Sequence, residues 1–126
     1  MRLVQFLQDG EQFLGLELKK SGDIINLNAA DASIPRDMRI FIEGGADVLE
    51  RALSASNRTD CLVMRDRIRL LAPITSCEKV LCIGMNYRDH CKELNFPIPR
   101  EPVVFNKFPS CVIGPEDSLK YPGYTE

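Results

Sequence analysis

The chain has 126 residues, of which 44% are hydrophobic and 27% are charged, and its formal net charge is −2. These values are ordinary for a globular protein, and the length fits one domain, or one small domain with part of another. The basic residues are scattered, so the charge pattern indicates no nucleic-acid partner and no acidic membrane surface. No apolar run approaches the roughly 18 residues of a membrane span.

The cysteines and the single histidine exclude the usual zinc sites. The five cysteines form no Cys-x-x-Cys pair, and one histidine cannot complete a Cys/His ligand set of ordinary spacing. We therefore expect reduced intracellular thiols that mostly act as small core residues. The first residues resemble a strand and show neither a secretory nor a transit leader, so the expected location is cytoplasmic or mitochondrial.

The first seventy residues predict a small β-rich domain with two helices. Residues 2–6 and 13–18 alternate apolar and polar side chains, and the intervening Gln8-Asp9-Gly10 predicts a β-hairpin. After the hairpin we expect a strand at 24–27, a loop at 28–35, helices at 38–43 and 46–55, and a strand at 67–71.

Residues 71–126 predict the start of a second domain. It follows a linker at 75–78 and begins with a short buried strand at 80–83, because that run is apolar throughout. Its other expected elements are a helix at 87–95 and strands at 102–108 and 111–113. The predicted fold class is therefore α+β and β-rich, with domains at 1–70 and 71–126.

The helix at 87–95 carries the only histidine, His90. Gly84 allows the backbone to turn after the strand, Asn86 with Asp89 forms a capping-box pattern, and Pro97 prevents the helix from continuing.

His90 and Glu93 are three residues apart, so they share one face of that helix. This spacing suits a general base held by a carboxylate, and it equally suits a solvated pair that contributes a few tenths of a kcal/mol. Cys91 lies beside His90 but projects about 100° away around the helix, which disfavours a Cys–His nucleophile.

Two motifs resemble the fumarylacetoacetate hydrolase family. The first is Gly84-Met-Asn-Tyr-Arg-Asp-His-Cys-Lys-Glu93, and the second is the spacing of Pro99, Pro102, Phe105 and Lys107 that precedes Gly114-Pro115. The resemblance implies a small N-terminal domain followed by a catalytic domain of β-roll or sandwich type, of which this chain would hold only the start.

The resemblance also implies an activity. Family members bind Mg2+ or a similar ion such as Ca2+ or Mn2+, usually as homodimers. They hydrolyse C–C bonds in β-dicarbonyl acids, decarboxylate oxaloacetate or interconvert its keto and enol forms. The family's catalytic His and Glu correspond to His90 and Glu93, on a helix that closes over a small oxo-acid substrate.

The family's metal ligands correspond to positions beyond this chain, so we expect no metal site within it. Glu116, Asp117 and Glu126 are the acidic residues after Lys107, and they lie in predicted loops. Because general-base catalysis alone supplies about 10²–10⁴-fold, we expect the chain by itself to be inactive. Lys107 and Tyr87 are further substrate-binding candidates, although a solvated lysine and a packed tyrosine explain them equally simply.

Three functions therefore remain open. The first is the His–Glu part of a metal-dependent enzyme of this family. The second is a non-catalytic truncated product that associates with full-length subunits. The third is an unrelated binding module built on residues 1–70.

Overall fold

The computed structural model describes residues 2–124. Its contacts divide the chain into two compact units, one of residues 1–76 with 112–126 and the other of residues 77–111. Each unit is described by itself. The predicted domain boundary near residue 70 stays a prediction, but the mixed α+β fold class is confirmed.

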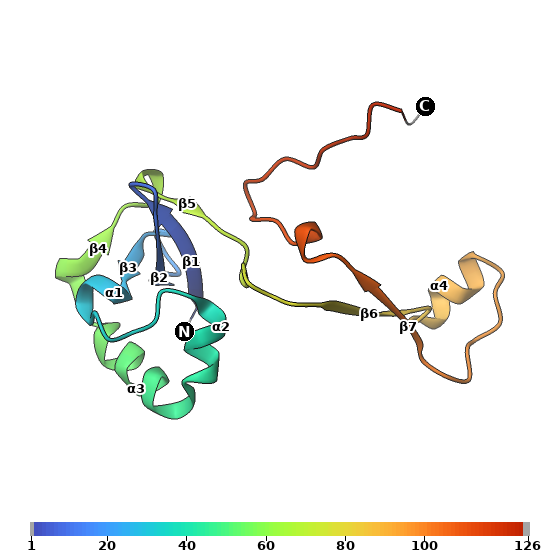
Figure 1. The fold of residues 1–126 in the computed structure, drawn as a ribbon, viewed down its shortest axis with the longest axis horizontal. Coiled ribbons are helices and arrows are strands. Elements are labelled where there is room, and N and C mark those ends of the chain that lie inside the picture. Colours follow the sequence, from blue (N-terminus) through green and yellow to red (C-terminus); the bar gives the residue numbers. More distant parts are fainter. Residues whose placement is uncertain (1, 125–126) are drawn as a thin grey trace. The chain divides into compact units, whose positions relative to one another are not determined.

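The first unit is built on a five-stranded antiparallel sheet with the order β4-β3-β2-β1-β5 (Figure 1). The strands are β1 Leu3–Gln8, β2 Glu11–Glu17, β3 Ile24–Asn26, β4 Leu62–Val63 and β5 Arg69–Leu70. The predicted hairpin joins β1 to β2 and pairs Gln8 with Glu11. Asp9 and Gly10 both have positive φ, as a two-residue type I′ turn requires.

Three helices follow the central strands. They are α1 Leu27–Ala30, α2 Met38–Glu43 and α3 Gly45–Ala55. The predicted helices at 38–43 and 46–55 are therefore confirmed within one residue. Asp37 caps α2, because its carboxylate accepts hydrogen bonds from the backbone N–H groups of Arg39 and Ile40.

Alternating residues of the sheet enter two separate apolar clusters. Leu14 of β2 packs with the helices, whereas Phe6 and Phe13 stack on the opposite face. The helix-facing cluster contains the buried residues Leu14, Leu27, Ile34, Met38, Phe41, Ala52 and Ala55. Successive strand residues thus point to opposite faces of the sheet, and both faces carry apolar side chains.

Gln5 is a buried polar exception on the helix-facing side. Its side-chain amide donates to the Ala72 carbonyl at 3.0 Å, and its oxygen accepts the Met38 backbone N–H at 2.7 Å. Gln5 therefore joins β1 to the start of α2 and to the segment after β5. Among residues 2–124, no buried side-chain nitrogen or oxygen atom lacks a hydrogen-bond partner.

Some sequence predictions for this unit were wrong. Residues 27–30 form α1 where the end of a strand and the start of a loop were expected, because Asn26 caps a single helical turn with its side chain. The short strand β4, which pairs with β3, was not predicted. Residues 109–111 form a 3₁₀ turn and 112–113 are irregular, so the strand expected at 111–113 does not exist.

The second unit consists of β6 Val80–Gly84, α4 Arg88–Glu93 and β7 Val103–Lys107. The two strands pair antiparallel, from Val80 with Lys107 to Gly84 with Val103. None of the helices described in either unit combines the length and the apolarity that a bilayer-spanning helix requires.

Candidate functional site

The turn from β6 into α4 positions the candidate catalytic helix. Met85 adopts a left-handed φ of 51°, whereas Gly84 still belongs to the strand and pairs with Val103. The prediction that Gly84 supplies the turn was therefore wrong. Met85, which follows the last paired residue of β6, has the left-handed conformation instead.

The ends of α4 also differ from the sequence prediction. Tyr87, and not Asn86, is the N-cap, and it makes no side-chain capping bond. At the other end Asn95 has a φ of 54°. The N–H groups of Asn95 and Phe96 donate to the carbonyls of Lys92 and Cys91 at 3.0 and 2.9 Å. This Schellman motif ends the helix at Glu93, four residues before Pro97, so the proline is not the direct stop.

Cys91 fixes the face that α4 turns inward. It is almost fully buried, and its thiol lies 3.5 Å from the Met85 carbonyl. The neighbouring His90 consequently projects outward, as expected for adjacent helical residues. A Cys–His nucleophile finds no support in this arrangement.

His90 and Glu93 lie on the same exposed face of α4. The distance from His90 Nδ1 to Glu93 Oε2 is 3.8 Å, and 51% of the His90 side chain is exposed. At this distance the two groups are too far apart for a hydrogen bond. The pair can tighten by side-chain rotation, which is common when a catalytic pair meets its substrate.

The substrate-binding candidates Lys107 and Tyr87 are not part of the His90–Glu93 pair. Lys107 pairs with Val80, whereas Gly84, at the end of β6 that leads into α4, pairs with Val103. Lys107 is therefore four residues along β7 from the end of the sheet next to α4. That separation is about 13 Å at ~3.3 Å per residue, so Lys107 is not brought beside the start of α4. Tyr87 is 74% exposed and is not packed as an anchor.

The strand that precedes the site is not buried, contrary to the prediction. Leu81 is 69% exposed and Ile83 is 50% exposed, and every residue of β7 is exposed. A continuous apolar run predicts burial only if other elements cover the strand. Within residues 77–111, only one neighbouring strand and a short helix are present.

No metal site forms among the residues that the structure describes. In residues 2–124, no three His, Cys, Asp or Glu side chains come together in a way that could hold an ion. Glu116 instead pairs with Arg65, and Asp117 pairs with Arg69. Glu126 lies outside the described residues.

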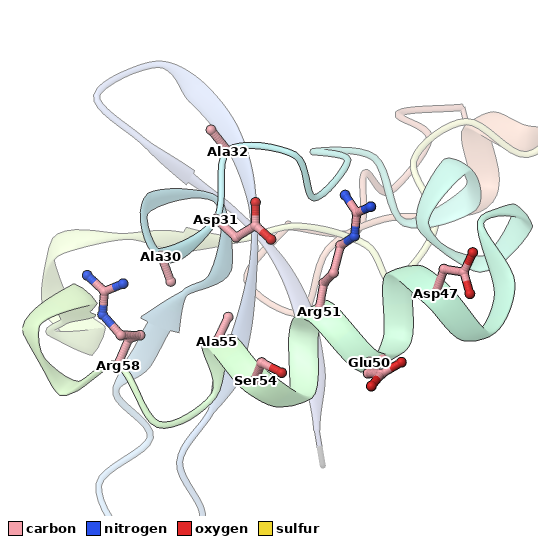
Figure 2. A pocket seen from close by; sticks show the side chains of 9 residues that line it. All are labelled: Ala30, Asp31, Ala32, Asp47, Glu50, Arg51, Ser54, Ala55 and Arg58. Carbon is pink, nitrogen blue, oxygen red and sulfur yellow. The ribbon is translucent and has the colours of Figure 1, made fainter.

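A pocket of about 840 Å³ lies in the first unit between α1 and α3 (Figure 2). None of the sequence-predicted site residues lines it. Its arginines already have hydrogen-bond partners: Arg51 donates to the Ser33 hydroxyl, and Arg58 donates two hydrogen bonds to the Asp60 carboxylate. The Arg58 hydrogen bonds lower the pKa of Asp60 to about 2. We therefore assign this pocket no role in catalysis.

Sequence analysis gave no role to Arg88 and Arg100. Both line a separate pocket of about 320 Å³ where β6 turns toward α4. Their sequence spacing carried no recognisable motif, because the loop between α4 and β7 is what brings them together.

Comparison with known proteins shows which family the chain resembles. Residues 79–126 match the family model described as fumarylacetoacetate (FAA) hydrolase C-terminal. This segment, which contains His90 and Glu93, is therefore similar to fumarylacetoacetate hydrolase proteins, and solved structures of similar proteins share the α+β fold.

Two similar proteins are named oxaloacetate tautomerases. Oxaloacetate tautomerase fahd2, mitochondrial, of Xenopus laevis is 50% identical over 124 residues, which cover 97% of this chain and 39% of the relative. Oxaloacetate tautomerase FAHD2A, mitochondrial, of Homo sapiens is 44% identical, with 97% and 40% covered. The chain therefore spans about two fifths of the length of these relatives.

Solved structures agree. A Mycobacterium smegmatis protein assigned as HpcE superposes with a TM-score of 0.72 at 26% identity, covering 98% of this chain and 41% of that one. Fumarylacetoacetate hydrolase from Exiguobacterium antarcticum superposes with a TM-score of 0.60 at 26% identity, and the superposition covers 90% of this chain and 37% of that one.

Proposed function

We propose that this chain carries the proton-transfer part of an enzyme that acts on small oxo-dicarboxylic acids, with keto–enol tautomerisation of oxaloacetate as the reaction. Two observations support the proposal. Relatives at 50% and 44% identity are named oxaloacetate tautomerases, and His90 and Glu93 face each other on one exposed side of α4. Hydrolysis of a C–C bond and decarboxylation are the alternative reactions on the same class of acids.

The proposed role of His90 follows from what tautomerisation requires. A proton must leave the carbon beside the keto group and reach the keto oxygen. An imidazole performs such a transfer when one ring nitrogen is held and the other is free. Glu93 lies on the Nδ1 side of His90. It would therefore orient the ring and stabilise its protonated form while Nε2 moves the proton.

A divalent metal is part of the proposal only for a longer protein. The residues described here do not fit a metal ion, so no step through one is assigned to them. We propose that Mg2+, or Ca2+ or Mn2+ in its place, is held by residues outside this chain and that the chain alone is inactive. A homodimer, and a mitochondrial location like that in the relatives' names, belong to the same proposal.

The experiment replaces His90 in a full-length protein that carries this sequence. We expect His90→Gln to lower the rate of oxaloacetate enol-to-keto conversion by about 10²–10⁴-fold, the usual contribution of a general base. The loss of enol absorbance measures the rate. Lys92→Gln is the matched control, since Lys92 lies on the same helix and contacts only Asp89. A His90→Gln protein within a few-fold of the parent rate would refute the assignment.

A second function is favoured by the exposure of the β6–β7 sheet. Leu81, Ile83 and Val104 project into solvent, as they would in a non-catalytic product that associates with full-length subunits. Co-expression of the tagged chain with a full-length relative separates the two functions. Recovery of mixed oligomers with reduced activity would favour this alternative, whereas recovery of the chain alone would reject it.

A further inference from the structure

The arginines of this chain differ in whether a carboxylate neutralises them. Six of them form ion pairs: Arg2, Arg36, Arg39, Arg58, Arg65 and Arg69. Arg51 donates to a serine hydroxyl. Within residues 2–124, Arg67, Arg88 and Arg100 have neither an ion pair nor a side-chain hydrogen bond. Of these three, Arg88 and Arg100 line one and the same pocket.

That pocket encloses about 320 Å³ within the second unit. One wall is the end of β6 with the turn that follows it, and the other is the loop of residues 98–103. Ile83, Ile98 and Val103 contribute apolar side chains to an otherwise polar lining, and Glu101 is the one acidic residue among the lining side chains. The charged groups of the lining therefore sum to +1.

Two guanidinium groups that form no ion pair, next to apolar side chains, match a small organic carboxylate. Arginine stays charged at any physiological pH, and its planar fork matches a carboxylate. The apolar side chains suit a short carbon skeleton, which a free inorganic anion lacks. The volume lies at the small end of the range for ligand pockets, which points to a small molecule.

The pocket is separate from the His90–Glu93 pair. Arg88 and His90 are two residues apart in α4, so they project about 200° apart around the helix axis. His90 and Glu93 are also absent from the pocket lining. A ligand held here would join the first residue of α4 to the loop that leads into β7, without occupying the face that carries the imidazole.

We propose that Arg88 and Arg100 form a binding site for a small organic carboxylate, distinct from the candidate catalytic face. Since the site needs neither His90 nor a metal, this proposal can be tested separately from the proposed function. Its bound ligand would restrain the start of α4.

Chemical labelling of arginine tests the site directly. The intact chain is treated with phenylglyoxal, with or without succinate at constant ionic strength, and labelling of each arginine is followed by mass spectrometry. At a succinate concentration of about twice its Kd, two thirds of the sites are filled, so labelling of Arg88 and Arg100 should slow about threefold. Arg67 is the internal control, because it is exposed, has no described partner and lines no such pocket.

Variants and a second anion complete the test. Arg88→Met should remove the protection of Arg100, and Arg100→Met that of Arg88, while Arg67→Met leaves both protected. Equal slowing at Arg67, or no slowing at all, would overturn the site. Inorganic phosphate that protects as well as succinate would overturn the assignment to an organic acid, because the apolar side chains would then contribute nothing.

Discussion

Asp37 shows how one side chain can hold a helix and respond to pH. Burial raises the pKa of its carboxyl, but hydrogen bonds from the Ile40 N–H, the Ser76 hydroxyl and the Arg39 N–H outweigh it, so the net pKa is lowered. A group with a lowered folded-state pKa stabilises the fold above its unfolded pKa of about 3.9 and loses that contribution as the pH falls through the folded value.

Replacing Asp37 should therefore have a pH-dependent cost. We expect Asp37→Ala to lower the free energy of unfolding by about 1 kcal/mol at neutral pH, as for other lost N-caps. Asp37→Asn should cost less, because the amide oxygen still caps the helix. Urea unfolding of both variants from pH 7 to pH 3 provides the measurement. The difference between the parent and Asp37→Asn should begin to shrink below about pH 4 and continue to shrink as the pH approaches the lowered folded-state pKa, and a constant difference would contradict the role of the carboxylate charge.

At the scale of elements, Gly15 sets how closely β2 approaches its neighbours. A Cβ built at this position would lie 2.2 Å from Ile24 Cγ2 and 2.9 Å from Phe6 Cε1. Both of those side chains are completely buried in the cluster on the face away from the helices. The sheet can therefore pack there only without a side chain at residue 15.

Gly15→Ala should destabilise the first unit. Overpacking a buried site costs about 1–3 kcal/mol, since Ile24 and Phe6 have no solvent side toward which to move. Thermal unfolding of the chain, followed by circular dichroism, measures the effect. Gly10→Ala is an informative comparison: its Cβ meets nothing within 4 Å, so any loss there comes from the positive φ of 82° alone. A Gly15→Ala chain as stable as the parent would show that the core is not closely packed at this point.

At the scale of the whole molecule, the two units differ in how much apolar surface they bury. The first unit encloses two clusters between and beside its strands and helices. In the second, Cys91 is the one buried residue among positions 77–111. Exposed apolar strand residues beside open strand edges favour association between molecules.

We therefore expect the isolated chain to self-associate through its second unit. Leu81→Lys together with Val104→Thr should raise the concentration at which the chain remains monomeric, as measured by light scattering. Ile42→Lys is the control, because Ile42 is an apolar residue of similar exposure on α2 in the first unit. If Ile42→Lys improved solubility as much as the strand variants did, the β6–β7 sheet would not be the associating surface.

The sequence by itself determined the features that depend on neighbours along the chain. These were the β1–β2 hairpin, the helices α2 and α3, the alternation of the sheet residues, and the shared face of His90 and Glu93. The family motif also lies in a continuous stretch. The tertiary structure alone decided the left-handed φ of Met85, the Asn95 helix end, the exposure of β6 and the placement of Arg88 and Arg100 on one pocket. Each of these depends on what packs against a segment, and an apolar run such as 80–83 cannot reveal whether anything covers it.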